Sequence, residues 1–93
     1  MFVRVVRFTD VTAERVESVV TRIDDTGPPP GVPIKKLQLV FDETQGTAVV
    51  LQYFDSEENL RAGADTFAAM DQSETPGSRV SVDTGELKVE REL

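Results

Sequence analysis

The sequence contains no histidine, no cysteine and no tryptophan, and it has a single tyrosine. Without histidine and cysteine, the chain cannot form a zinc finger, an iron–sulfur cluster, a thiolate nucleophile or a Ser-His-Asp triad. Disulfide bonds are excluded as well, so cysteine usage carries no information about the redox compartment. The sequence therefore predicts neither a metal site nor a bound cofactor, and any chemistry must come from other side chains.

Long hydrophobic runs are absent too. Ala48–Leu51 is among the longest apolar stretches, far below the roughly 18 residues that a membrane span needs. Arg4 and Arg7 interrupt the N-terminal apolar segment, so we expect no signal peptide and a cytoplasmic protein. With 17 acidic and 10 basic residues, the net charge of −7 repels phosphate backbones and anionic lipids, which argues against nucleic-acid or membrane partners.

The composition is that of one soluble globular domain spanning residues 1–93. Hydrophobic residues make up 39% of the chain and charged residues 29%, values ordinary for a folded protein. A domain this small has a modest core and often gains stability from a disulfide, a metal or a partner subunit. Since the first is excluded and the second is unsupported, we expect an oligomer.

The first third of the chain predicts a strand followed by a helix. Phe2–Phe8 is rich in valine and phenylalanine, as strands are. Helical spacing then begins, with Thr12 as the N-cap and Val11 placed to pack on the first turn. Gly27 and the triproline 28–30 end this helix. Its apolar stripe is formed by Val16, Val19, Val20 and Ile23.

A hairpin follows, with strands Ile34–Phe41 and Thr47–Phe54 around the turn Asp42–Gly46. We expect Phe41 to lie opposite Thr47. That register places an apolar face toward the helices, made by Leu37, Leu39, Val49, Leu51 and Tyr53. It places Lys36, Gln38, Val50 and Gln52 on a mixed outer face.

The last third predicts a second helix and a final strand. Ser56 is the expected N-cap of the helix, whose stripe comprises Leu60, Ala64, Phe67 and Ala68, with Met70 near its end. The final strand is expected from Arg79 to about Leu93. Its apolar alternation changes parity after Val82, which predicts a β-bulge at Thr84–Gly85.

The expected order is strand, helix, strand, strand, helix, strand, the pattern of α+β ferredoxin-like βαββαβ folds with a four-stranded antiparallel sheet and two helices on one face. The final strand is about twice as long as Phe2–Phe8, its expected neighbour. Its second half would expose Leu87, Val89 and Leu93 unless a second subunit covered them. We therefore expect a homodimer through the C-terminal strand, with a frayed tail as the alternative.

With this architecture, the chain resembles the dimeric α+β barrel superfamily, which includes antibiotic biosynthesis monooxygenases, haem-degrading monooxygenases and stress-responsive barrel proteins. The local pieces that carry the resemblance are Phe54-Asp55-Ser56-Glu57-Glu58 at the start of the second helix and Arg79-Val80-Ser81-Val82 at the start of the last strand. The resemblance implies two sheets facing each other in a dimer, and a small-molecule pocket between each sheet and its helices.

Few polar side chains are available for such a pocket. Tyr53 is the first candidate, although a structural role is common for a half-buried tyrosine, and Asn59 is the single asparagine. Arg4 and Arg7 lie on opposite faces of the first strand, and the pattern leaves open which of them faces the helices. An arginine there predicts either an ion pair, for which Asp83 is a candidate, or an anion site. The predicted pocket comprises Tyr53, Arg7, Phe67, Met70 and Asn59, and the predicted dimer interface Gln38, Gln52, Leu87, Val89 and Leu93.

Two functions remain open. The favoured one is a non-enzymatic or accessory homodimer that binds a small apolar molecule between sheet and helices. The alternative is a cofactor-independent monooxygenase acting on a small aromatic or polyketide-like substrate. The lack of tryptophan and histidine weighs against the alternative, because the resemblance implies that oxygenases of this superfamily commonly use those side chains.

Overall fold

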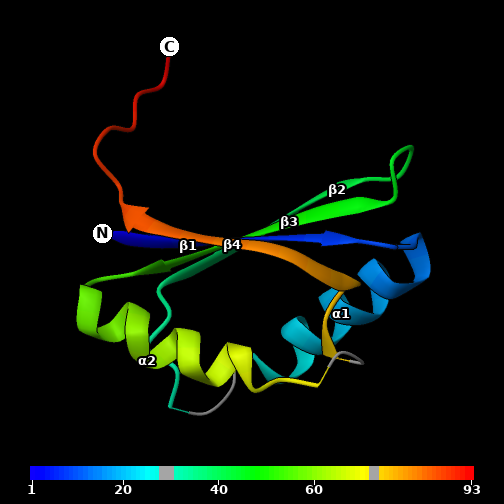
Figure 1. The fold of residues 1–93 in the computed structure, drawn as a ribbon, viewed down its shortest axis with the longest axis horizontal. Coiled ribbons are helices and arrows are strands. Elements are labelled where there is room, and N and C mark those ends of the chain that lie inside the picture. Colours follow the sequence, from blue (N-terminus) through cyan, green and yellow to red (C-terminus); the bar gives the residue numbers. More distant parts are fainter. Residues whose placement is uncertain (28–30, 72–73) are drawn as a thin grey trace.

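The computed structural model describes residues 1–27, 31–71 and 74–93, so the triproline at 28–30 and residues 72–73 lie outside the described residues. Strands and helices follow one another in the predicted order (Figure 1). Their bounds are β1 Phe2–Thr9, α1 Ala13–Thr26, β2 Lys36–Asp42, β3 Thr47–Phe54, α2 Glu57–Ala68 and β4 Ser78–Glu86. No helix within the described ranges is long and apolar enough to cross a membrane.

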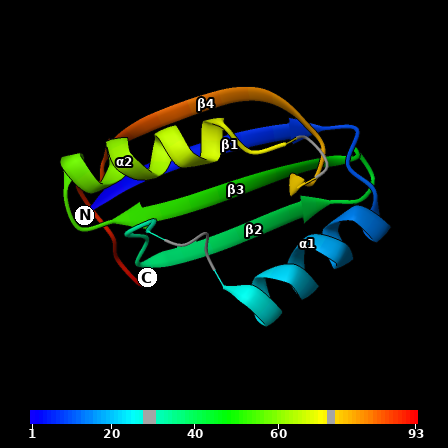
Figure 2. The ribbon, with the colours of Figure 1, turned by 90° about the horizontal axis from the view of Figure 1, so that it is seen from below.

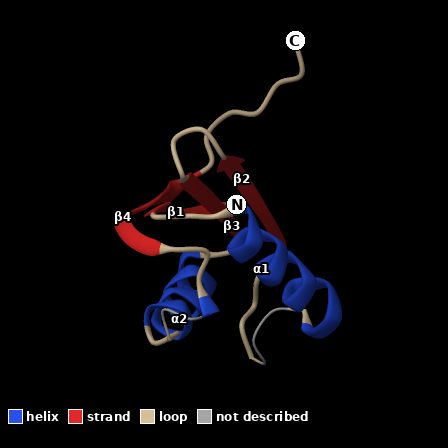
Figure 3. Ribbon diagram, turned by 90° about the vertical axis from the view of Figure 1, so that its right-hand side faces the viewer, coloured by secondary structure: helices blue, strands red, loops and turns tan. Residues whose placement is uncertain are grey.

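The strands form one antiparallel sheet in the order β2-β3-β1-β4. Both helices lie on the same face of this sheet, and the other face is left open (Figures 1 and 3). Viewed from the helix side, α2 runs along the β1–β4 half of the sheet and α1 lies toward β2 (Figure 2). The predicted ferredoxin-like α+β sandwich is therefore confirmed.

Both helices begin at the predicted N-cap residues. The Thr12 hydroxyl accepts a hydrogen bond from the Arg15 N–H at 3.2 Å, and the Ser56 hydroxyl accepts one from the Asn59 N–H at 3.1 Å. Each satisfies a backbone donor that the first helical turn leaves unpaired. At the other end of α1, Gly27 has a φ of 69° and its N–H donates to the Ile23 carbonyl at 2.8 Å, which ends the helix as expected.

The register predicted for the hairpin is wrong by one residue. Phe41 pairs with Ala48, and Asp42 pairs with Thr47. The turn is therefore one residue shorter than expected, and it is closed by the Gly46 N–H, which donates to the Asp42 carbonyl at 2.9 Å. Gly46 has a φ of 66°, a backbone conformation that glycine adopts without strain.

This one-residue shift exchanges the two faces of β3, because side chains alternate along a strand. Ala48, Val50, Gln52 and Phe54 face the helices and are buried, whereas Val49, Leu51 and Tyr53 are half-buried on the open face. Gln52 was expected on the open face and Tyr53 on the helix face, and both placements are wrong. The apolar residues Leu37 and Leu39 of β2 face the helices as predicted.

The last strand is shorter than predicted. β4 ends at Glu86, and the expected continuation to Leu93 is wrong beyond that residue. One more backbone bond joins the Leu87 N–H to the Met1 carbonyl at 2.9 Å. Residues 87–93 then diverge from the sheet and are exposed to solvent. They lie on the side of the sheet away from the helices (Figure 1). We call residues 87–93 the C-terminal tail.

The bulge also lies elsewhere. Arg7 pairs with Ser81 and Phe8 pairs with Arg79, so Val80 is the extra residue in β4. From Ser81 to Glu86 the register runs without interruption, and the bulge predicted at Thr84–Gly85 is wrong. The change in apolar parity between Val82 and Leu87 therefore does not indicate a bulge. It coincides with the end of β4 at Glu86.

The hydrophobic core consists of two clusters that share no residue. The first cluster lies around the ends of β1 and β3 near the start of α1 and contains Val6, Phe8, Val11, Ala48 and Val50, with Val16 packed against it. The second lies under α2 and contains Phe54, Leu60 and Phe67, with Phe2, Val32, Ile34 and Met70 packed against it. The boundary between these two clusters is where the polar residues of the interior lie.

Candidate functional site

A buried polar pair lies between the two clusters. Arg4 of β1 and Gln52 of β3 are cross-strand partners that face the helices, and their side chains are 3% and 4% exposed. The Arg4 Nη1 donates to the Gln52 Oε1 at 2.9 Å. Since Arg4 faces the helices, Arg7 of the same strand lies exposed on the opposite face. The pattern of β1 had left this choice open.

The guanidinium of Arg4 is only partly satisfied. Its Nε is buried and has no hydrogen-bond partner in the described part of the chain. The ring of Phe67 lies 5.7 Å from its central carbon, a cation–π distance. Burial is the larger of two effects that lower the pKa of Arg4, and repulsion by the charge of Arg79 is the second. An arginine nevertheless stays protonated at any physiological pH.

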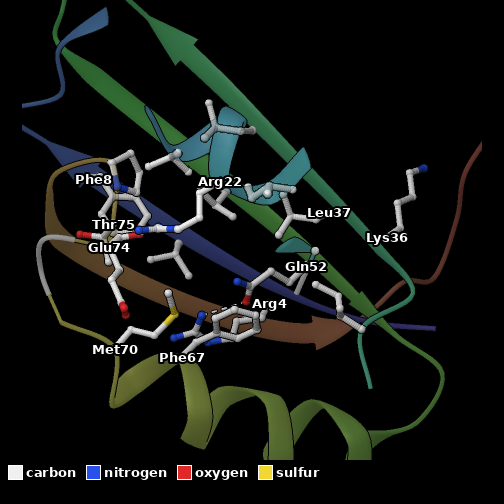
Figure 4. A pocket seen from close by; sticks show the side chains of 18 of the residues that line it. Arg4, Phe8, Arg22, Lys36, Leu37, Gln52, Phe67, Met70, Glu74 and Thr75 are labelled. Atoms are coloured by element: carbon white, nitrogen blue, oxygen red, sulfur yellow. Dashed lines mark hydrogen bonds between the residues drawn. The ribbon is translucent and has the colours of Figure 1, made fainter. Parts of the chain in front are cut away.

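The pair opens into a cavity of about 590 Å³ between the sheet and the two helices (Figure 4). The helix-facing residues of β1, β2 and β3 form its floor, and residues from α1 and from the end of α2 form its walls. Most of the lining is apolar, and its main contributors are Val6, Val50, Leu37, Leu39, Ile23, Phe67 and Met70. A volume of this size is within the range of small-molecule sites.

Arginines close one end of the cavity by holding the segment before β4. Arg22 of α1 donates to the Glu74 carbonyl, and Arg15 donates to the Thr75 carbonyl at 2.6 Å. Arg79 of β4 donates to the Phe67 carbonyl at 3.2 Å, at the C-terminal end of α2 where a cation is favoured. These contacts are made to backbone carbonyls, and they hold the side chains of Arg22 and Arg79 at the lining of the cavity.

The cavity is therefore positively charged within an acidic protein. Arg4, Arg22, Lys35 and Arg79 contribute positive charges to its lining, and Glu74 is the only carboxylate among its described lining residues. Lys36 also borders the cavity, but its ammonium lies over the ring of Tyr53 on the open face. Lys35 forms an ion pair with Asp55 at 3.3 Å, but this pair is exposed and contributes little. An anion entering the cavity would thus meet an attractive potential.

Two of the five predicted pocket residues line this cavity. Phe67 and Met70 do so, as expected. Tyr53 lies on the open face, where its hydroxyl donates to the Gln38 Oε1 at 2.8 Å. Arg7 is exposed on the same face, and Asn59 is half-buried in the first turn of α2, away from the cavity. The placement of Tyr53, Arg7 and Asn59 in the pocket is therefore wrong.

The residues predicted for a dimer interface are divided between three regions. Gln38 is on the open face, bonded to Tyr53 and exposed. Gln52 is in the cavity. The tail residues Leu87, Val89 and Leu93 are exposed. Asp83 was predicted as an ion-pair partner for an arginine. It pairs with Val5 and therefore lies on the open face of the sheet, whereas Arg4 lies on the helix face.

The alternation of β1 already contained a signal for Arg4. Phe2, Val6 and Phe8 share its face, whereas Val3, Val5 and Arg7 share the other. Two phenylalanines on the face of Arg4 indicate that this face is buried, because large aromatic side chains dominate cores. Gln52 could not be found in the same way, because its placement depends on the register of the hairpin.

Metal ligands do not gather at this site. In residues 1–27, 31–71 and 74–93, no group of three or more acidic side chains is placed to hold a metal ion. The cavity offers one soft donor, the thioether of Met70. What its described lining presents instead is a buried cation, an amide and an apolar wall.

Solved structures share this architecture over nearly the whole chain. A putative antibiotic biosynthesis monooxygenase from Deinococcus radiodurans has a TM-score of 0.60 at 10% sequence identity, covering 100% of this chain and 98% of that one. A second antibiotic biosynthesis monooxygenase has a TM-score of 0.51 at 14% identity, covering 98% and 100%. The chain has the antibiotic biosynthesis monooxygenase-like fold. The predicted resemblance is thus confirmed at the level of fold.

A third structure with this fold holds a large ligand. It is an arginine-to-serine mutant of MhuD with two manganese protoporphyrin IX molecules bound per active site, with a TM-score of 0.57 at 16% identity, covering 100% of this chain and 98% of that one. No protein-family model matches the chain, and no curated protein matches it in sequence. At these identities the likeness concerns the fold, and function must be argued from the cavity itself.

Proposed function

We propose that the protein binds a small, largely apolar molecule in the cavity between the sheet and the helices, in a non-enzymatic or accessory role. The observation that carries this proposal is the cavity of about 590 Å³, which separates the two core clusters. A small domain that needed the space only for stability would fill it, because an empty apolar cavity costs folding free energy.

A paired substitution on α1 tests this binding. Ile23 is half-buried and lines the cavity, whereas Val20 on the same helix is exposed and does not. We expect the neutral fluorescent probe N-phenylnaphthylamine to bind the native protein. Ile23→Trp should weaken that binding by about tenfold or more, since about 1.4 kcal/mol of lost contact suffices for a factor of ten. Val20→Trp should leave it unchanged.

Native mass spectrometry of the purified protein gives independent evidence, because a molecule that copurifies would appear as a mass increment. Ile23→Trp should reduce that increment and Val20→Trp should not. The proposal is wrong if the probe binds the native protein and both variants equally, or if it does not bind and no molecule copurifies.

We also propose that the protein is a homodimer formed through the open face of the sheet and the C-terminal tail. Val3, Val5, Val49 and Leu51 make this face largely apolar, and the tail exposes Leu87, Val89 and Leu93. Covering such side chains is favourable by about 25 cal/mol for each Å² removed from water. The backbone hydrogen bond from the Leu87 N–H to the Met1 carbonyl, just before β1, holds only the first residue of the tail and leaves the rest available to a partner.

A cofactor-independent monooxygenase is the alternative proposal. Two observations favour it: the fold shared with proteins described as antibiotic biosynthesis monooxygenases, and the buried Arg4–Gln52 pair, whose N–H groups would stabilise an enolate or phenolate oxygen of a bound substrate. The substrate would be a small aromatic or polyketide-like molecule that itself reacts with dioxygen.

Oxygen uptake distinguishes the two proposals. Anthrone is a suitable probe, because its enolate reacts with one dioxygen to give anthraquinone and water. We expect no uptake above the uncatalysed rate if the protein is a binding protein. Uptake that depends on the native protein and is lost in Arg4→Gln would establish the alternative instead.

The donor set does not fit a porphyrin. Haem iron in proteins is held by histidine, cysteine, methionine or tyrosine. The first two are missing from the sequence, and the single tyrosine, Tyr53, lies on the other face of the sheet. Met70 is thus the one such side chain on the described lining of the cavity. We derive no chemistry through a haem for this chain.

A further inference from the structure

The buried cation of the cavity has no counterion among the residues that the structure describes. Arg4 is the only charged side chain classed as buried in the described ranges. Its contacts are the neutral amide of Gln52 and the ring of Phe67. The charge that acts on its pKa is that of Arg79, which has the same sign. A buried charge is costly unless it is paired. The protein alone leaves this requirement unmet.

The contacts of Arg4 also fix its orientation. Gln52 holds the Nη1 atom, the ring of Phe67 lies against the guanidinium, and the Nε is buried with no partner (Figure 4). One N–H donor of the planar group is thus left without an acceptor in the described part of the chain. The paired N–H groups of a guanidinium match the two oxygens of a carboxylate in spacing and in plane.

The surroundings select for an anion with an apolar body. The net charge of the chain is −7, yet Arg22 and Arg79 add to the charge of Arg4 in the described lining, which contains a single carboxylate. The rest of the lining is mainly aliphatic and aromatic. A purely inorganic anion would leave those side chains without contacts, and a neutral apolar molecule would leave Arg4 without a counterion.

We propose that the ligand is an organic monocarboxylate whose carboxylate pairs with the guanidinium of Arg4 and whose apolar body packs against Phe67, Met70, Val50 and Leu39. This inference rests on the proposed binding function and names the class of molecule that the cavity takes. Gln52 is a positioning residue, because it acts on the ligand by holding the guanidinium.

Matched acids and amides test the class of ligand. Isothermal titration of the full chain would compare naphthoate with naphthamide and dodecanoate with dodecanamide, which share their apolar bodies and differ in the charged group. We expect the better-fitting acid to bind about 10-fold to 100-fold more tightly than its amide, the range that charge-assisted hydrogen bonds supply. Equal binding of acid and amide would overturn the inference and leave the proposed binding function standing.

A carboxylate introduced beside Arg4 tests whether Arg4 is the anion site. Gln52→Glu keeps the shape of the side chain and places a carboxylate beside Arg4, so we expect it to abolish the preference for the acid and to retain binding of the amide. Val20→Glu is the control, because it adds the same charge at an exposed position of α1 that does not line the cavity. Arg4→Gln should lose the preference as well, which keeps the test decisive if one variant does not fold.

The outcomes separate the two proposals. Retention of the acid preference in both Gln52→Glu and Arg4→Gln would show that Arg4 is not the anion site. Failure of every acid and every amide to bind the native protein, with no molecule copurifying, would overturn the binding function and this inference with it. Circular dichroism melts confirm that each variant is folded before binding is measured.

Discussion

Arg4 and Gln52 are opposite each other on β1 and β3, and their hydrogen bond of 2.9 Å lies at the boundary between two hydrophobic clusters. The pair therefore interrupts the core at its centre. An aliphatic pair at these positions would join the clusters into one continuous core. Placing a cation there instead costs stability and creates a place where an anion is favoured.

Removing the acceptor of this pair should destabilise the fold. Gln52→Leu leaves the Nη1 of Arg4 buried without its acceptor, so we expect the free energy of unfolding to fall by about 1–3 kcal/mol. Urea denaturation followed by circular dichroism measures the change. Gln45→Ala, in the exposed turn, should stay within about 0.5 kcal/mol of the native protein. Equal stability of Gln52→Leu and the native protein would show that the amide contributes nothing to holding Arg4.

Gly63 is required by close packing of α2 on the sheet. A Cβ at this position would come within 2.5 Å of the Phe54 Cε1, and Phe54 is completely buried. Overpacking typically costs about 1–3 kcal/mol, which outweighs the gain of about 1 kcal/mol in helix propensity. We expect Gly63→Ala to lower the Tm by several degrees. In a thermal melt, Gly85→Ala should not lower the Tm, because no atom lies within 4 Å of its added Cβ.

Tyr53 should play no part in ligand binding. Its hydroxyl bonds Gln38 on the open face, separated from the cavity by the sheet. We expect Tyr53→Phe to bind the fluorescent probe and the preferred acid with unchanged affinity in the titrations above. Weakened binding without a change in oligomeric state would contradict the register described for β2 and β3.

The dimer can be disrupted at two separate places. Val5→Glu puts a charge on the open face, and removal of residues 87–93 takes away the tail. We expect each change to convert the dimer to a monomer by light scattering at micromolar concentration, while the circular dichroism spectrum stays native. Val20→Glu adds the same charge to an exposed position of α1 and should leave the dimer intact. A native protein that is monomeric under these conditions would refute the dimer.

Glu86 should titrate at unusually low pH. A hydrogen bond and the positive charge of Lys88 lower the pKa of this carboxyl. The interaction is present above the ordinary pKa of glutamate and is lost as the pH falls through the lowered value. We expect NMR titration to show the pKa rising toward its ordinary value in Lys88→Gln. Because this pair is exposed, the Tm at neutral pH should not change.

Local signals in the sequence predicted the type and order of the elements and the ends of the helices. Thr12, Ser56 and Gly27 mark helix ends through hydrogen bonds to their own neighbours, so no tertiary information is needed. The order of strands and helices follows from such signals, and the sheet topology follows from that order. Phe67 could be placed in the cavity because it lies on the apolar side of α2, and Met70 because it follows the end of that helix at helical spacing from Phe67.

The candidate site depended on information that is not local. Along β3, Val49 and Leu51 are as apolar as Ala48 and Val50, so alternation alone does not show which set is buried. The decision is made by the turn, where Asp42 accepts hydrogen bonds from Gln45 and Gly46. A register error of one residue there moved Gln52 out of the cavity and Tyr53 into it.

The separation of the core into two clusters bears on how a ligand enters and leaves. Because no residue belongs to both, a shift of α1 at its end of the sheet would disturb the first cluster and leave the packing of α2 on Phe54 intact. Exchange of a ligand then requires rearrangement of one half of the interior and not cooperative unfolding of the domain. Motions of this kind take about microseconds to milliseconds. The residence time of the ligand would then be set by its affinity and not by the opening of the cavity.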